Sequence, residues 1–265
     1  MSRYNDIDMN VWKNYDEIQT DSLWLIDRRD KSGVHVGDYH GNFVPQIPHQ
    51  LFMRYTKKGD WILDPFMGSG TSLIEAQRMN RNAIGIDLQQ KIIDSAINRI
   101  SAESNDDSKI FTFCGDSSEI SIQNILDSVE IKNFQFVIFH PPYWDIIKFS
   151  DNQKDLSNCA NLEDFLNNFG KVIDNTTKFL EKNRYCACVI GDKFANSQVI
   201  PLGFYCMNLF MEKNFLLKAI IVKNFGETKG KSNQQNLWRY RALKSDYYIF
   251  KHEYIFVFEK IFGGI

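Results

Sequence analysis

The fold of this 265-residue chain is indicated by the stretch DPFMGSGT, residues 64–71. It follows a short apolar run at residues 61–63 and precedes a helical pattern at residues 71–79. A strand, a glycine-rich turn and a helix in this order are typical of parallel sheets that bind ligands at their strand ends. Gly68 and Gly70 lack a Cβ, so we expect the backbone there to pass close to a ligand.

The same alternation of strand and helix continues along the chain. Further strands are expected at 83–87, 110–114, 134–139, 184–191, 216–222 and 254–258, and helices at 89–101, 162–180 and 202–213. Alternation on this scale predicts an α/β fold with a mostly parallel, Rossmann-like sheet covered by helices on both faces. Residues 1–50 are polar and rich in Gly and Pro, so we expect an irregular segment there and one domain at 51–265.

Three carboxylates follow successive expected strands. Asp64 ends the first, Asp87 ends the second 23 residues later, and Asp116 comes just after the third. One extended ligand with an ammonium group, a ribose diol and an aminopurine would engage all three, and S-adenosylmethionine is such a ligand. We therefore assign the cofactor site to Asp64, Phe66, Gly68, Ser69, Gly70, Thr71, Asp87 and Asp116. The alternative for each Asp alone is a helix cap or a turn.

A nucleotide site is the rival interpretation of the glycine turn. The dinucleotide pattern fails because residue 73 is Leu, and no Gly-Lys-Ser/Thr follows as a phosphate loop requires. The carboxylate of Asp64 would also repel a pyrophosphate.

The expected strand at 134–139 ends in His140-Pro141-Pro142-Tyr143. This turn resembles the Asp/Asn/Ser-Pro-Pro-aromatic signature of the DNA amino-methyltransferases, and residues 64–71 match that family's cofactor motif at every fixed position. The resemblance covers roughly residues 35–260. It implies a methyltransferase fold with an antiparallel C-terminal strand, S-adenosylmethionine as cofactor and double-stranded DNA as substrate.

The resemblance assigns catalysis to His140, Pro141, Pro142 and Tyr143. The Pro141 carbonyl and the side chain of residue 140 would accept hydrogen bonds from the target amine, and Tyr143 would stack on the flipped base. The family usually has Asp, Asn or Ser at the first position, and a neutral imidazole can also accept. The alternative is that His140 only ends the strand. Adenine N6 is the expected target, with cytosine N4 as the alternative.

Two further segments complete the expected site. Residues 40–48 resemble the family segment that closes over the cofactor, with Phe43 as its packing residue; core packing is the alternative. Residues 213–251 carry nine Lys or Arg against two acids, although the whole chain has a net charge of −2. We expect DNA contacts from 223–251 and from the loop after the catalytic turn, through Lys148, Asn233, Gln234, Gln235, Trp238, Arg239 and Arg241. The alternative is a solvated surface hairpin.

Composition and cysteines limit the other possibilities. Apolar runs are far shorter than a membrane span needs, and 43% hydrophobic with 24% charged residues is globular. Five cysteines without paired CxxC spacing predict a reducing cytoplasm, with no zinc site and no disulfide framework. An RNA base methyltransferase and a non-catalytic DNA-binding subunit remain open, as does a homodimer or a partner specificity subunit.

Overall fold

The computed structural model describes residues 4–37, 39, 41–103, 107–225 and 235–261. An eight-stranded sheet forms its centre, in the order β1-β9-β10-β6-β5-β2-β3-β4. The pairs β2–β3, β2–β5, β3–β4, β5–β6 and β1–β9 are parallel, and β10 is antiparallel to both β6 and β9. The strands are β1 Leu23–Trp24, β2 Trp61–Asp64, β3 Asn82–Asp87, β4 Ile110–Cys114, β5 Phe134–Phe139, β6 Leu180–Ile190, β9 Phe215–Asn224 and β10 His252–Lys260. The expected α/β fold with an antiparallel C-terminal strand is confirmed.

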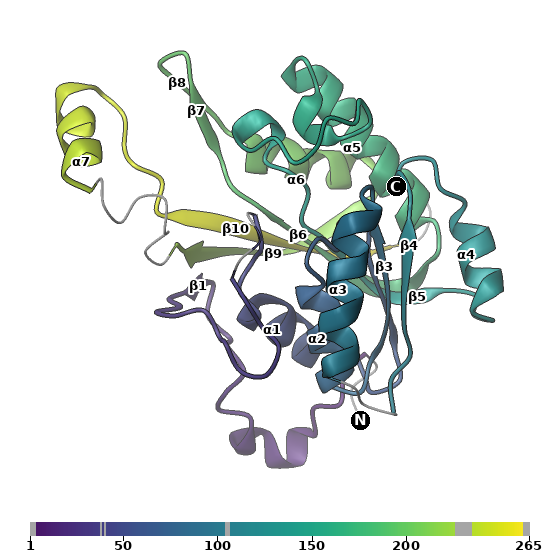
Figure 1. Cartoon of the computed structure of the whole chain (residues 1–265). Coiled ribbons are helices and arrows are strands. Elements are labelled where there is room, and N and C mark those ends of the chain that lie inside the picture. Colours follow the sequence, from purple (N-terminus) through teal and green to yellow (C-terminus); the bar gives the residue numbers. More distant parts are fainter. Residues whose placement is uncertain (1–3, 38, 40, 104–106, 226–234, 262–265) are drawn as a thin grey trace.

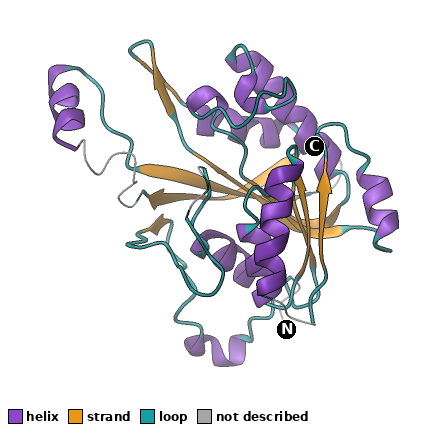
Figure 2. Cartoon of the chain, in the orientation of Figure 1, coloured by secondary structure: helices purple, strands orange, loops and turns teal. Residues whose placement is uncertain are grey.

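Helices cover both faces of this sheet (Figures 1 and 2). The period of two along β5 sends Val137 and Phe139 into one core cluster, and Phe136 and Ile138 into the other. The first cluster is completed by α4 Ile122–Ser128, α5 Leu162–Thr177 and α6 Leu202–Glu212. The second is completed by α1 Gln46–Tyr55, α2 Thr71–Arg78 and α3 Gln90–Ala102. Burial on both sides explains why the strands read as continuous apolar runs.

The order of the strands places the two motifs side by side. From β2 the chain builds outward through β3 to β4, then returns to the other side of β2 with β5. The carboxyl ends of β2 and β5 therefore flank the topological switch point, which is where open α/β sheets bind ligands. The DPFMGSGT turn follows β2, and the turn that begins at His140 follows β5.

Several elements differ from the sequence expectations. Helix α1 begins at Gln46, so the boundary expected at residue 50 falls inside a helix. Its Pro48 lies in the first turn, where the missing N–H costs nothing. Helix α5 ends at Thr177 rather than residue 180, because Leu180 already begins β6. Helix α4 and the strand β1 were not predicted.

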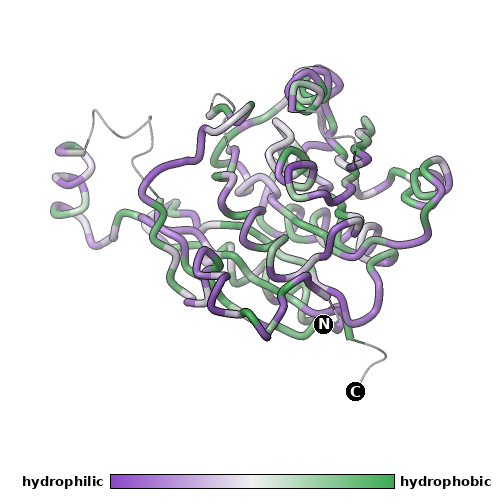
Figure 3. Tube along the Cα trace, turned by 90° about the horizontal axis from the view of Figure 1, so that it is seen from below, coloured by the Kyte–Doolittle hydropathy of each residue, from purple (hydrophilic) through white to green (hydrophobic). Residues whose placement is uncertain are grey.

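Two elements extend beyond the carboxyl edge of the sheet. The hairpin of β7 Lys193–Ala195 and β8 Gln198–Ile200 turns at Asn196 and Ser197, both at positive φ. Helix α7 Gln235–Lys244 lies in the basic segment and stands apart from the body of the molecule in both views (Figures 1 and 3). Residues 235–244 of the basic segment are therefore helical and residues 245–251 are irregular, in place of the plain hairpin that was the alternative.

Candidate functional site

A cleft of about 1890 Å³ opens at the carboxyl ends of β2, β3 and β5. Its walls include the glycine turn, the catalytic turn, the N-terminal segment and residues that follow α7. Of the expected cofactor residues, the lining contains Phe43, Asp64, Phe66, Gly68, Ser69, Thr71, Asp87 and Asp116, and of the expected catalytic residues all four. Gly70 does not line the cleft.

The two glycines of the turn are required for different reasons. Gly68 has φ +47°, and a Cβ there would lie 3.1 Å from Cε1 of Tyr39. Gly70 has φ +80°, and its Cβ would lie 3.3 Å from the side chains of Ala96 and Ile100. Gly70 thus caps α2 and lets α3 pack closely, so the expectation that its backbone faces the ligand is wrong.

Asp64 is the most deeply buried carboxyl group of the cleft. Oδ1 accepts a hydrogen bond from the Phe66 N–H at 2.9 Å, and Oδ2 accepts one from the Ser72 hydroxyl. Burial raises the pKa of Asp64 to about 7, because the hydrogen bonds only partly offset the loss of solvation and Asp87 adds repulsion. A cation next to Asp64 would favour its charged form.

Asp87 and Asp116 shape the neighbouring strand ends. Asp87 accepts from the Gly68 N–H at 3.1 Å and from the Gln89 N–H at 2.9 Å, which ties the glycine turn to the end of β3. Burial raises the pKa of Asp87 above its usual value. Asp116 accepts from the N–H and hydroxyl of Ser118 through Oδ1. The three acids follow adjacent strands, as the sequence predicted.

Two buried polar atoms of the cleft wall have no partner among the described residues. They are the hydroxyl oxygen of Ser69 and the Nδ2 of Asn42. The Asn42 side chain is fixed by its own oxygen, which accepts from the Thr71 hydroxyl at 2.6 Å. Buried polar groups normally have partners, so these atoms indicate a polar ligand. With the three carboxylates they suit the amino-acid and nucleoside parts of S-adenosylmethionine.

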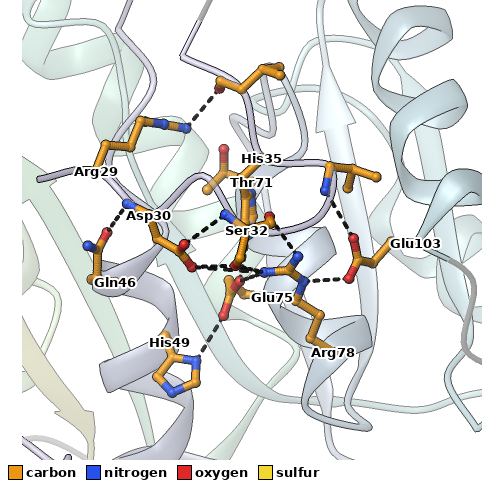
Figure 4. Close-up of polar contacts among 12 residues, drawn as sticks. Arg29, Asp30, Ser32, His35, Gln46, His49, Thr71, Glu75, Arg78 and Glu103 are labelled. Atoms are coloured by element: carbon orange, nitrogen blue, oxygen red, sulfur yellow. Dashed lines mark hydrogen bonds and ion pairs between the residues drawn. The ribbon is translucent and has the colours of Figure 1, made fainter.

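The N-terminal segment is tied to α1 and α2 by a buried charged cluster (Figure 4). Glu75 of α2 accepts from His35 at 2.6 Å and contacts His49 of α1 at 2.9 Å. Arg78 donates to the Ser32 carbonyl at 2.8 Å and to Glu103 at 2.7 Å. These contacts hold Ser32 and His35 against α2, in the segment whose described residues supply part of the cleft wall.

His140 lies where this segment meets the catalytic turn. Its ring centroid is 4.8 Å from that of Phe43, which is 7% exposed. Burial lowers the pKa of His140 to about 4, with Lys223 adding to the effect and Glu253 opposing it. The imidazole is therefore neutral at pH 7 and has one nitrogen free to accept a hydrogen bond.

The Tyr143 hydroxyl is bound by Glu253, which in turn is bound by Lys223, and sequence reasoning missed both residues. The hydroxyl donates to Glu253 Oε2 at 2.8 Å, and Glu253 Oε1 accepts from Lys223 Nζ at 2.9 Å. The signal was available, since Lys223 follows one apolar strand pattern, Glu253 precedes the next, and antiparallel pairing sets such residues opposite each other.

The expected DNA contacts fall into three groups. Trp238 and Arg241 line the cleft, and the Arg241 guanidinium lies 5.4 Å from the Trp238 ring. Arg239 is exposed on α7 outside the cleft, and Lys148 is exposed and paired with Asp151 at 2.6 Å. Asn233 and Gln234 lie outside the described residues, and of Gln235 only its place at the start of α7 is described.

Tyr39 and Lys193 of the cleft were also missed, whereas Phe149 belongs to the loop after the 140–143 turn, where contacts were expected. Tyr39 and Phe149 approach across the mouth with ring centroids 6.2 Å apart. Lys193 of the β7–β8 hairpin lies 3.8 Å over the Trp144 ring, next to the catalytic turn. Nothing in their local sequence marks them, because segments distant along the chain bring them together. Within the described residues, no cluster of His, Cys, Asp or Glu is arranged to hold a metal.

Comparisons with known sequences match both motif regions. A family model described as DNA methylase matches residues 3–98, and one described as an RMKL-like methyltransferase domain matches residues 51–156. Type II methyltransferase M.Cfr9I of Citrobacter freundii is 32% identical over 82 residues, which are 31% of this chain and 26% of that protein. Type II methyltransferase M2.DpnII of Streptococcus pneumoniae is 31% identical over 109 residues, 38% and 41% of the two chains. The chain spans less than half the length of these curated relatives.

Solved structures agree on the fold. TrmN from Thermus thermophilus aligns with a TM-score of 0.53 and 16% identity, over 83% of this chain and 49% of that one. A SAM-dependent methyltransferase from Methanosarcina mazei aligns with a TM-score of 0.52 and 13% identity, over 80% and 98%. None of the helices in the described part of the chain combines the length and hydrophobicity needed to cross a bilayer.

The sequence matches are to methyltransferases, and the fold agrees with them. They imply S-adenosylmethionine as the cofactor, and the carboxylates and orphaned polar atoms of the cleft fit that molecule. The two motifs that carry the resemblance both lie within matched regions and meet at one cleft. Over these matched regions the chain is similar to DNA methylases and to Type II methyltransferases.

Proposed function

We propose that this protein transfers a methyl group from S-adenosylmethionine to the exocyclic amine of a base flipped out of double-stranded DNA. Adenine N6 is the first candidate target and cytosine N4 the alternative. The observation that carries the proposal is the convergence of the 64–71 turn and the 140–143 turn on one cleft at the switch point of the sheet.

The cofactor supplies an electrophilic methyl group on a sulfonium. Asp64, Ser69 and Asn42 are proposed to engage its amino-acid end, and Asp87 and Asp116 its ribose and adenine. Residues 1–50 are proposed to close over it, with Phe43 as the contact between cofactor and catalytic turn. The contacts of Figure 4 support this arrangement, because they hold the segment against α2, which follows the glycine turn.

The proposed hydrogen-bond acceptors at the 140–143 turn would make the target amine a better nucleophile. The lone pair of an exocyclic amine is delocalised into the base, so the amine is a weak nucleophile. An acceptor on each amine proton localises that pair on nitrogen, and the neutral His140 ring and the Pro141 carbonyl are the proposed acceptors. Tyr143 is proposed to stack on the base, which must leave the duplex to reach the cleft.

DNA is proposed to approach over the β7–β8 hairpin and the 223–251 segment. Lys193 of the hairpin and Trp238 and Arg241 of the segment line the cleft, and they offer positive charge and a stacking surface. The sequence leaves open a homodimer or a partner specificity subunit.

The test is incubation of the protein with labelled S-adenosylmethionine and unmethylated duplex DNA, followed by nucleoside mass spectrometry. N6-methyladenine is the expected product, and N4-methylcytosine would select the alternative. The RMKL-like domain match makes RNA a second candidate substrate, so structured RNA belongs in a parallel reaction. Methylated nucleoside from RNA alone would overturn the DNA assignment.

A further inference from the structure

A row of three residues crosses the sheet beneath Tyr143. Glu253 of β10 is paired in register with Lys223 of β9. On the other side, a Cβ placed on Gly191 would lie 3.9 Å from the Glu253 Cβ and 2.9 Å from Cε2 of Tyr143. Gly191 therefore leaves the space that the Tyr143 ring occupies, and the hydroxyl of that ring reaches Glu253.

Lys223 and Glu253 form a buried ion pair, each with a side chain 5% exposed. Burial of either charge alone is costly, and the two side chains offset that cost by pairing with each other. A carboxylate has no proton and can only accept. Of its two oxygens, one accepts from Lys223 and the other from the Tyr143 hydroxyl.

The Tyr143 hydroxyl has one proton, and the neutral His140 ring has one, so the bond that Tyr143 makes to Glu253 limits how it can bind His140. The single hydroxyl proton of Tyr143 is donated to Glu253 at 2.8 Å. Toward His140 Nε2, 3.5 Å away, the hydroxyl oxygen can therefore only accept. The contact is a hydrogen bond only when Nε2 carries the proton of the neutral imidazole, which leaves Nδ1 without one.

We propose that Glu253, held by Lys223, is a positioning residue that fixes the tautomer of His140 through the Tyr143 hydroxyl, so that Nδ1 is the nitrogen offered to the target amine. The last clause rests on the proposed methyltransferase function. The tautomer itself is a property of the protein alone, so it can be measured without any substrate.

The first readout is ¹⁵N NMR of histidine-labelled protein at pH 7, with the His140 signals identified by their loss in His140→Asn. Wild type should show the Nε2–H tautomer. In Lys223→Met/Glu253→Leu the hydroxyl proton of Tyr143 has no acceptor below it and turns to Nε2, so the Nδ1–H tautomer should appear. In Lys223→Met/Glu253→Gln the amide oxygen still accepts from Tyr143, and the wild-type tautomer should remain.

The second readout is the single-turnover rate of methyl transfer to DNA. The Leu variant should lose about a hundredfold in rate, the order expected when a positioned proton acceptor is lost. The Gln variant should keep most of the rate. The control is the double variant Asp60→Asn/Arg184→Met. It removes a partly buried ion pair that lies outside the cleft, where Asp60 precedes β2 and Arg184 lies on β6, and it should leave the tautomer and the rate unchanged.

Tyr143→Phe covers the case in which the Leu variant does not fold. It keeps the ring and removes the hydroxyl, so His140 should show a mixture of tautomers. An Nδ1–H tautomer in wild type would overturn the inference, as would one tautomer shared by all variants. If no nucleic acid is methylated, the proposed function fails while the NMR result still decides the tautomer.

Discussion

At the scale of single residues, His140 controls how the site should respond to pH. Burial lowers the pKa of His140 to about 4, so the ring stays neutral through the range in which an exposed histidine takes up a proton. Single-turnover methyl transfer at saturating cofactor should therefore hold from pH 8 down to about 5 and fall near pH 4. His140→Asn should remove that step, because an amide does not titrate. A fall near pH 6.5 that survives in His140→Asn would assign the titration to another group.

Asp64 has the opposite shift. Its pKa of about 7, against an ordinary value of 3.8, means that the free protein retains a proton there which a solvent-exposed Asp would have lost. An ammonium bound nearby favours the carboxylate, so S-adenosylmethionine should release a fraction of a proton at pH 7 and bind more tightly as pH rises through 7. Calorimetry in two buffers of different ionisation enthalpy measures the release. Asp64→Asn should abolish it, and undiminished release in that variant would remove Asp64 from the ammonium site.

At the scale of elements, the contact of the N-terminal segment with α1 and α2 depends on Glu75. Burial alone would raise the pKa of Glu75, but the hydrogen bonds and charges of His35 and His49 outweigh it and lower the pKa to about 2. A carboxyl group with a lowered pKa stabilises the fold above its ordinary pKa of 4.5, and this contribution is lost as pH falls from there through 2.

Glu75→Gln should lower the free energy of unfolding by on the order of 1–3 kcal/mol at pH 7, because buried donors lose a charged partner. It should also weaken cofactor binding. Asp30→Asn is the control, since its carboxylate is more exposed and lies 4.0 Å from Arg78, where an ion pair contributes little. Denaturant unfolding of both variants, repeated at pH 3, measures the effect. Equal destabilisation by the two substitutions would contradict the importance of Glu75.

At the scale of the whole molecule, the cleft joins segments from five distant parts of the chain: described residues between 26 and 44, the 64–71 turn, the 140–143 turn, the β7–β8 hairpin and residues around α7. Arg241 lines this cleft and Arg239 of the same helix does not. Arg241→Ala should therefore weaken DNA binding more than Arg239→Ala and reduce the salt slope of log K by about one. Binding titrations at several salt concentrations measure both slopes. If wild type and Arg241→Ala had the same salt slope of log K, Arg241 would not contact a DNA phosphate.

The motifs and the main strands were readable from local sequence, because each depends on neighbouring residues. The 64–71 turn, the acids at 64, 87 and 116, and the turn at 140–143 follow apolar runs that could only be buried strands. Helix α1 was not predicted, because Pro45, Pro48 and several polar residues interrupt its apolar pattern. Its buried face became evident only in the folded chain, where it packs into the second core cluster.

The sequence by itself determined the fold class and the place of the 64–71 and 140–143 turns at the ends of two strands. Only the tertiary structure decided that Gly70 serves helix packing, that burial raises the pKa of Asp64 to about 7, and that the Lys223–Glu253 pair binds the Tyr143 hydroxyl. The physical reason is that burial, proton affinity and cross-strand pairing depend on atoms brought together by folding from distant parts of the chain. Local patterns specify which strands form, and the register between those strands specifies which charges meet.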